Sequence, residues 1–258
     1  MASLLNTFTR RAKPTTISLF GIFTSPFTLT RPNSTLTQAR CSRFLLRQAS
    51  EFAPRECPTP LVLLRAKGLA GAEDEKEDYY AWGGMFSERG YTAVEIDIDA
   101  PEQSTSNKES LQVMAKELSQ QIRLMMIPFP PIIVSTGSST LLSQAFISDH
   151  PASALVLINP PSSADETRLL TQTTETPQDA SQAISGKGFD YEPHFPILYL
   201  STKTETPEHR LQAHAERGVG RGGKGVTFEV LDESRAPGGE RGEGTRMELE
   251  RWLDRCGY

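Results

Sequence analysis

Short apolar segments alternate with stretches of helical periodicity from about residue 58 onward, and this alternation constrains the fold more than any other feature. Apolar runs of about four to eight residues are typical of strands that are buried on both faces. Strands are predicted at residues 60–64, 91–98, 132–134, 154–158, 196–201 and 226–231. Helices are predicted at residues 79–88, 105–126, 141–148, 208–217 and 247–256. The order predicts an α/β fold, with a mostly parallel sheet and helices on both of its faces.

The longest predicted helix, residues 105–126, has the clearest periodicity. Its apolar side chains recur every three or four residues, at Leu111, Met114, Leu118, Ile122 and Met125. That spacing places them on one face of a helix, which we expect to pack against the sheet. The prolines at positions 128, 130 and 131 should end the helix, because proline cannot continue the backbone hydrogen-bond pattern.

The charges of the chain are divided unevenly along it. Residues 1–50 hold seven Lys or Arg, fifteen Ser or Thr, and no Asp or Glu. An Arg-rich and Ser-rich segment without acids is typical of an organelle transit peptide. We therefore expect a mitochondrial (matrix) transit peptide over residues 1–50 and a mature domain over residues 51–258, starting between residues 42 and 58. A disordered basic tail and a secretory signal are the alternatives.

Several classes of protein and site are not expected. No run of about 18 apolar residues occurs, so the sequence predicts no transmembrane segment. The net charge of −5 argues against a nucleic-acid partner. The three cysteines have the spacing of neither a zinc site nor a disulfide framework. The sequence thus predicts no cofactor-binding site and no metal site.

The glycine-rich segment at residues 218–225 matches two phosphate-binding patterns on paper. Both patterns require a strand before the glycines and a helix after them, so that phosphate meets a helix N-terminus. Here the predicted helix comes before the segment and the predicted strand after it. We therefore expect a flexible loop, and a second Gly-rich loop at residues 235–246.

The segment after the strand at residues 132–134 reads Ser135-Thr136-Gly137-Ser138-Ser139 and leads into a helix. This strand–turn–helix, with the strand at 154–158 that follows it, resembles the α/β-hydrolase family over residues 58–258. In that family the sharp turn G-x-S-x-G carries the nucleophilic serine, and the order along the chain is serine, acid, histidine. The resemblance implies an α/β-hydrolase fold, here with a short or absent lid in the polar insert at residues 162–193.

Two registers of that turn are possible. In the first, Ser135–Ser139 overlays the motif, and the nucleophile position is Gly137, which has no side chain to attack with. In the second, the motif begins at Gly137, Ser139 becomes the nucleophile, and Leu141 takes the place of the final glycine. Ser138 is a further candidate hydroxyl. The first register places small residues where strand and helix approach closely, and it is the one we favour.

The other parts of a catalytic site are altered as well. A serine needs a base within hydrogen-bond reach, and the family's histidine follows the last strand. No histidine follows Leu231; the four in the chain are His150, His194, His209 and His214. Glu205 stands where the resemblance places the acid, in the turn after the strand at 196–201. Gly68, after the first strand, could present a backbone N–H to an oxyanion.

These departures lead to two hypotheses about function. The first is a mitochondrial α/β-hydrolase-like protein that is catalytically degenerate and acts as an accessory or scaffold subunit or binds a small ligand. The alternative is a serine esterase or thioesterase that uses Ser139 or Ser138 in an altered site, with Glu205 as acid. The expected partners are mitochondrial proteins or a small acyl ligand.

Overall fold

A computed structural model describes residues 38–74, 79–102, 106–171, 195–202, 209, 211–212, 225–231 and 239–258, all within the unit Ser34–Tyr258. Glu205, His194 and His214 lie outside the described residues. So do most of the predicted helix at 208–217, most of the insert at 162–193, and nearly all of the loop at 218–225. Among the helices of the described ranges, none is both long and apolar enough to cross a bilayer.

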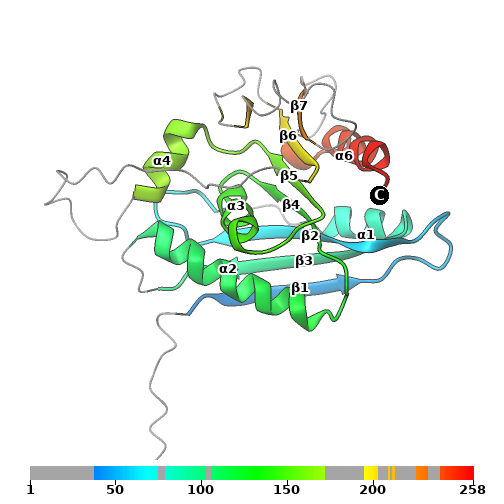
Figure 1. Ribbon diagram of the computed structural model, residues 1–258, viewed down its shortest axis with the longest axis horizontal. Helices are drawn as coiled ribbons and strands as arrows, with labels where there is room; N and C mark the ends of the chain where they lie inside the picture. Colours follow the sequence, from blue (N-terminus) through cyan, green and yellow to red (C-terminus); the bar gives the residue numbers. More distant parts are fainter. Residues whose placement is uncertain are drawn as a thin grey trace, which may run out of the picture. The chain divides into compact units, whose positions relative to one another are not determined.

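The described residues form a seven-stranded sheet with the order β1-β3-β2-β4-β5-β6-β7 (Figure 1). Only β1 runs antiparallel to its neighbour, and the other adjacent strands are parallel. The strands are β1 (Arg40–Arg47), β2 (Cys57–Lys67), β3 (Tyr91–Asp99), β4 (Ile132–Thr136), β5 (Ala154–Ile158), β6 (Ile197–Ser201) and β7 (Val226–Val230). The predicted mostly parallel sheet is confirmed.

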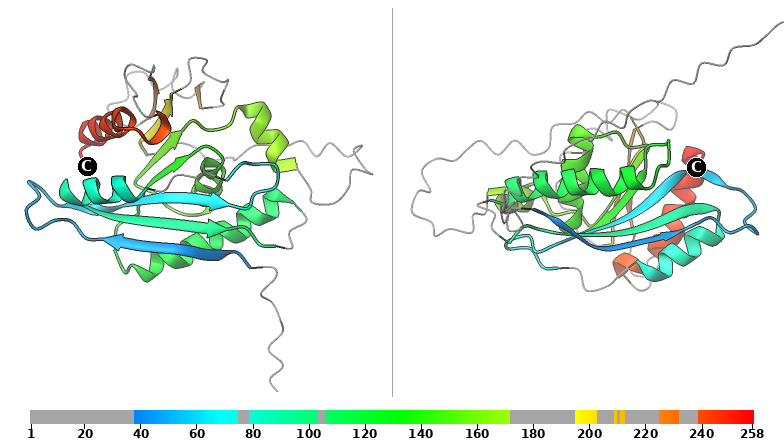
Figure 2. Two further views of the ribbon diagram at one scale, coloured as in Figure 1. Left: turned by 180° about the vertical axis from the view of Figure 1, so that it is seen from behind. Right: turned by 90° about the horizontal axis from the view of Figure 1, so that it is seen from below.

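Helices cover both faces of this sheet (Figure 2). One face carries α2 (Asn107–Leu124) and α3 (Ser139–Asp149), and α4 (Ser163–Thr171) packs beside α2. The other face carries α1 (Tyr80–Glu88) and α6 (Glu243–Cys256). The short 3-10 helix η2 (Gly239–Arg241) leads into α6.

Strand β2 shows why both faces are apolar. Its side chains alternate between the two faces, as in any strand. Val62 and Leu64 belong to the core under α2 and α3, whereas Leu61 and Leu63 belong to the core under α1 and α6. All of these side chains are fully buried, so a continuous apolar run, rather than an alternating one, specifies a central strand.

The predicted strands, and the helices predicted at 79–88, 105–126, 141–148 and 247–256, are present with shifted ends. The strand predicted at 154–158 matches β5, and the helix predicted at 105–126 is α2, with Leu111, Met114 and Leu118 buried as its periodicity indicates. Helix α2 begins after Ser106, whose side chain accepts a hydrogen bond from the backbone N–H of Glu109. Helix α6 begins at Glu243, so part of the loop predicted at 235–246 is helical.

Strand β1 was not predicted, and it lies within the segment 1–50 assigned to a transit peptide. Its sequence, RCSRFLLR, is rich in arginine and has only a short apolar run. As an edge strand it needs only one neighbour, β3, and its residues alternate between exposed and half-buried. The weak pattern follows from the edge position, where no second strand and little core demand apolar side chains.

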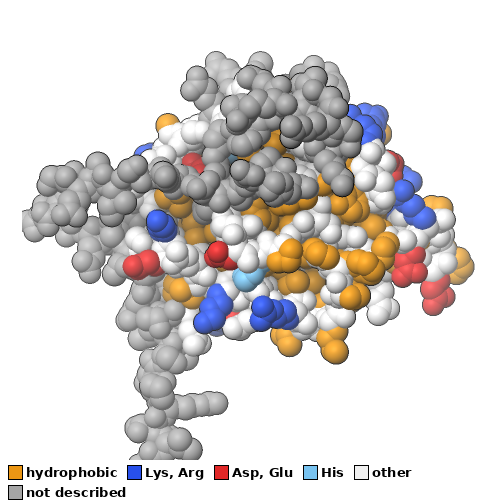
Figure 3. Space-filling model, viewed as in Figure 1, with side chains coloured by type: hydrophobic (Ala, Val, Ile, Leu, Met, Phe, Trp, Pro, Cys, Tyr) orange, Lys and Arg blue, Asp and Glu red, His pale blue; other side chains and the backbone are white. Residues whose placement is uncertain are grey.

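Helix α2 ends in an exposed apolar turn. Met126 has a left-handed φ of 55° and is 89% exposed, and Leu124 and Phe129 are also exposed. Figure 3 shows hydrophobic side chains gathered on this face of the molecule. The positive φ stops the helix before the prolines at 128, 130 and 131, as the sequence predicts.

Gly90 and Gly257 both have a left-handed backbone, but a side chain would clash with neighbouring atoms only at Gly90. Gly90 joins α1 to β3 at φ 96°, and a Cβ there would lie 1.7 Å from the carbonyl oxygen of Arg55. Gly257 follows α6 at φ 86°, with nothing within 4 Å of a Cβ. Gly257→Ala should cost about 1 kcal/mol of unfolding free energy, and Gly90→Ala about 3 kcal/mol, because only Gly90→Ala also displaces backbone. Urea unfolding of both variants tests this, and equal losses would contradict it.

Candidate functional site

A left-handed turn at Gly137 joins β4 to α3. Gly137 has φ 50°, a conformation that glycine adopts at little cost. Its N–H donates to the carbonyl oxygen of Ile158 at 2.9 Å, which ties the turn to the end of β5. The Thr140 hydroxyl donates to the carbonyl oxygen of Gly137 at 2.6 Å. The residue at the sharpest point of the strand–turn–helix is therefore one without a side chain.

Ser139, the candidate nucleophile of the second register, is fully buried. Its Oγ accepts a hydrogen bond from the backbone N–H of Ala66 in β2 at 2.8 Å. A second pair of hydroxyls, Ser135 and Ser143, lies 2.8 Å apart between β4 and α3. Small hydroxyl side chains thus connect the first two turns of α3 to the sheet beneath it.

Ser138 is the partly exposed hydroxyl of this turn. Its Oγ donates to the carbonyl oxygen of Glu73 at 3.4 Å, in the loop after β2. Gly68, in the same loop, has φ 74°, and its N–H donates to Asp74 Oδ1 at 2.8 Å. The N–H that the resemblance assigned to an oxyanion therefore bonds a side-chain carboxylate in this structure.

The two described histidines both have other partners. The ring of His150, just after α3, lies 4.8 Å from that of Phe146. His209 is buried, with its Nε2 3.6 Å from Glu166 Oε2, and its Nδ1 accepts from the N–H of Leu211. The described residues thus present both imidazoles in structural contacts.

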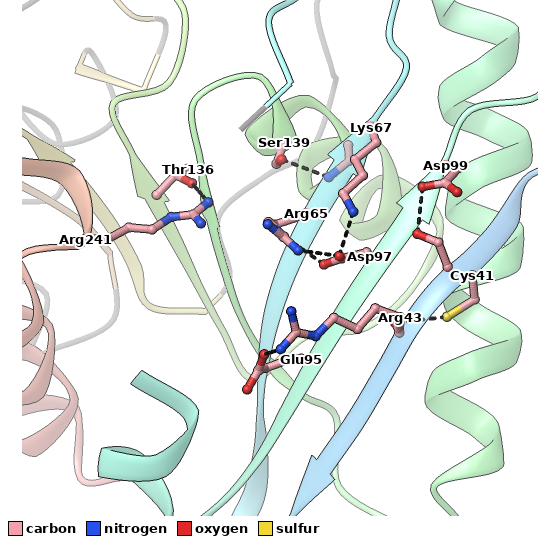
Figure 4. A network of polar contacts seen from close by, with 12 residues as sticks. Cys41, Arg43, Arg65, Lys67, Glu95, Asp97, Asp99, Thr136, Ser139 and Arg241 are labelled. Atoms are coloured by element: carbon pink, nitrogen blue, oxygen red, sulfur yellow. Dashed lines mark hydrogen bonds and ion pairs between the residues drawn. The ribbon is translucent and has the colours of Figure 1, made fainter. Parts of the chain in front are cut away.

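A buried ion-pair network lies across the carboxyl ends of β2 and β3 (Figure 4). Arg65 donates to Asp97 through Nε at 2.8 Å and through Nη2, and Lys67 Nζ lies 2.9 Å from Asp97 Oδ2. Burial disfavours the carboxylate of Asp97, but hydrogen bonds from Arg65 and Lys67 outweigh it and hold its pKa below the ordinary value. Asp97 is therefore ionised at neutral pH, and both Arg65 and Lys67 form ion pairs with it.

Arg241 reaches the turn from η2, in the segment that follows β7. Its Nη2 donates to Thr136 Oγ1 at 2.9 Å, and its guanidinium carbon lies 4.1 Å from the centroid of the Tyr79 ring. The Tyr79 hydroxyl is 3.1 Å from the same Thr136 oxygen, and Trp82 Nε1 donates to the Arg241 carbonyl at 2.9 Å. These contacts fix the guanidinium beside the last residue of β4.

Burial and the charge of Arg65 lower the pKa of Arg241 to about 10. Arg241 is still a cation at neutral pH, because that pKa is well above 7. Burial also raises the pKa of the Tyr79 phenol above its usual range, so Tyr79 remains a neutral hydroxyl. At neutral pH the turn thus faces a guanidinium and a phenol, and neither is a general base.

Asn159 joins the carboxyl ends of β5 and β6 to η2. It has a left-handed φ of 46°, and its Nδ2 donates to Thr202 Oγ1 and to Glu240 Oε1, each at 2.7 Å. The N–H of Thr202 returns a bond to Asn159 Oδ1 at 2.8 Å. Asn159 thereby holds the segment that carries Arg241 against the edge of the sheet.

Sequence reasoning missed Tyr79, Thr136, Asn159 and Arg241. Asn159 carried one usable signal, since it directly follows a predicted strand at the edge where parallel sheets place their sites. Arg241 carried none, because it lies in a Gly-rich segment that was predicted to be a flexible loop.

Neither a known protein family nor a curated protein matches this chain in sequence. Its structure is similar to that of Thermogutta terrifontis esterase 2 phosphoramylated by tabun, with 13% identity, 86% of this chain and 96% of that chain covered, and a TM-score of 0.53. A structure from a study of carboxylesterases of the Thaumarchaeon Nitrososphaera gargenis has 9% identity, the same coverages and a TM-score of 0.52. These likenesses confirm the predicted α/β-hydrolase fold.

The two serines of the turn should differ in what they contribute to stability. Ser139→Ala leaves the buried N–H of Ala66 without its acceptor, so we expect a loss of about 1–3 kcal/mol in unfolding free energy. Ser138→Ala removes a long bond at a partly exposed site and should change stability by less than about 0.5 kcal/mol. Chemical denaturation of the two variants tests the difference. Equal stability of the two would contradict a structural role for the Ser139 hydroxyl.

Proposed function

We propose that this chain, which has the α/β-hydrolase fold, is catalytically degenerate and binds a small ligand at the carboxyl edge of its sheet. The observation that carries the proposal is Gly137 at the left-handed turn between β4 and α3. In the fold that this chain shares, the residue at that turn carries the nucleophile. Glycine offers no atom that can form a covalent intermediate there.

The surroundings of the turn support the same proposal. The Ser139 hydroxyl is buried and accepts the N–H of Ala66, so attack would require it to leave a structural bond. A serine also needs an adjacent base to become nucleophilic. Among the described residues of the segment after β7, Arg241 reaches the turn, and it is a donor without a lone pair to accept a proton.

One candidate for catalysis remains as the alternative. Structures similar to this one include an esterase, and Ser138, next to Gly137, is a partly exposed hydroxyl. An esterase or thioesterase working through Ser138 or Ser139 would take Glu205 as its acid and would need a base from another part of the chain.

A fluorophosphonate probe, which modifies activated serines, separates the two proposals. We expect no labelling of the full-length chain beyond that of the Ser138→Ala and Ser139→Ala variants, while an active serine esterase in the same tube labels fully. We also expect no turnover of p-nitrophenyl esters above the rate in buffer. If the wild-type chain is labelled and one of the two substitutions abolishes the labelling, the proposal of a degenerate site is refuted and the substituted serine is the nucleophile.

We further propose that the protein is imported into the mitochondrial matrix. The support is the composition of the N-terminal segment, which has no acid before Glu51. Because Arg40–Arg47 forms strand β1, the import signal is best sought in residues 1–37, where the basic residues are Arg10, Arg11, Lys13 and Arg31. In that location an accessory or scaffolding role is a second form of the non-catalytic proposal.

A fluorescent reporter fused to residues 1–37 should accumulate in mitochondria. Replacing Arg10, Arg11 and Lys13 with Glu should leave the reporter diffuse, because the membrane potential draws positive charge inward. Fluorescence microscopy with a matrix marker measures both fusions. A diffuse signal from the unaltered segment would refute the mitochondrial proposal, and secretion of the reporter would favour a signal peptide.

A further inference from the structure

We propose that the ligand of this site is recognised through an oxyanion group, a carboxylate or a phosphate, that Arg241 binds with the help of Lys67 and Arg65. The proposal deepens the proposed function, since it rests on the ligand-binding half of it. Only the oxyanion group of the ligand is proposed, and the rest of the ligand is to be identified by experiment.

The first argument is the position of Arg241. It enters from the segment after β7, which is where the resemblance places a catalytic histidine, and it bonds Thr136 at the end of the strand that precedes Gly137. A guanidinium cannot take a proton from a hydroxyl, so it cannot replace a general base. What a guanidinium does well is bind carboxylate or phosphate through its planar fork of N–H donors.

The second argument is the gathering of charge. Arg65 and Lys67 lie at the carboxyl end of β2, and Arg241 bonds Thr136 at the carboxyl end of β4 (Figure 4). The two strands are neighbours, with Leu64 paired to Ser135, so Arg65 and Thr136 are the next residues on adjacent strands. The charge of Arg65 accordingly helps to lower the pKa of Arg241. Asp97 is shared between Arg65 and Lys67, and Glu240 accepts from the amide of Asn159. Two guanidiniums held near each other in a partly buried site favour a further anion between them.

The third argument is preorganisation. The guanidinium of Arg241 lies over the Tyr79 ring, and the Arg241 backbone is held by Trp82 through its indole N–H. Thr136 fixes one of the two terminal nitrogens. Lys67 is more accessible than Arg65, with its side chain 33% exposed against 7% for that of Arg65. A ligand arriving from solvent would thus meet Lys67 before Arg65, and it would find the guanidinium of Arg241 already oriented.

Titration calorimetry of the full-length chain at constant ionic strength tests the proposal with three probes. Inorganic phosphate and octanoate carry the two kinds of oxyanion, and octanamide is the neutral match for octanoate. We expect saturable binding of octanoate or of phosphate, and binding of octanamide at least tenfold weaker than that of octanoate. The oxyanion that binds more tightly identifies the class of ligand.

Four variants make the assignment specific. Arg241→Gln should weaken oxyanion binding at least tenfold. Arg241→Lys keeps the positive charge, so it should weaken binding less than Arg241→Gln does. Lys67→Gln should weaken binding severalfold. Arg168→Gln, which changes an exposed arginine of α4, should leave binding unchanged. Circular dichroism checks that each variant is folded. If Arg241→Gln does not fold, Arg241→Lys and Lys67→Gln still decide the outcome.

The proposal is overturned if the folded wild-type chain binds neither octanoate nor phosphate saturably up to millimolar concentration. It is also overturned if Arg241→Lys and Lys67→Gln bind oxyanions as tightly as wild type does. Fluorophosphonate labelling is a separate readout. Labelling of the wild type would refute the proposal that the chain is catalytically degenerate, but it would not affect Arg241-dependent oxyanion binding. The two proposals can therefore fail independently.

Discussion

The close approach of α3 to the sheet is the constraint on which the centre of this structure depends. The chain passes from β4 to α3 through two residues, Gly137 and Ser138, and Gly137 takes a left-handed backbone in this tight turn. The helix then lies so near the strands that small hydroxyls, Ser139 to Ala66 and Ser135 to Ser143, are the groups that fit between them. The position of α3 and the small size of these serines are therefore consequences of the same close approach.

That constraint separates two roles that a serine at such a turn can have. A nucleophile must sit at the tip of the turn, exposed and beside a base, whereas a packing hydroxyl must be buried and have a fixed partner. Ser139 has the second set of properties, and Gly137 holds the tip. The small residues of this turn thus satisfy the packing that the fold requires, which is a separate requirement from presenting a nucleophile.

The sequence was sufficient to predict what depends on local pattern. Continuous apolar runs predicted β2 and β5, three-and-four spacing predicted α2, and the small residues around Gly137 predicted the sharp turn after β4. Strand β1 was not predicted, because an edge strand needs few apolar side chains and its sequence has only a short apolar run. The place of Arg241 in the site could not be predicted, because it depends on contacts with Thr136 and Tyr79, which are more than a hundred residues away in sequence. No local pattern encodes which distant side chain a flexible-looking segment will meet.

The charges around the turn are the part of the structure that packing alone does not explain. Burying an ion pair gains little stability, because the loss of hydration roughly cancels the attraction between the charges. Asp97 nevertheless lies under two cations, and Arg241 is held close to Arg65 despite their repulsion. Apolar side chains at these positions would have joined the core already present around Leu61 and Leu63. The proposed ligand gives these charges a role, since an anion is the species whose binding each of the three cations would favour.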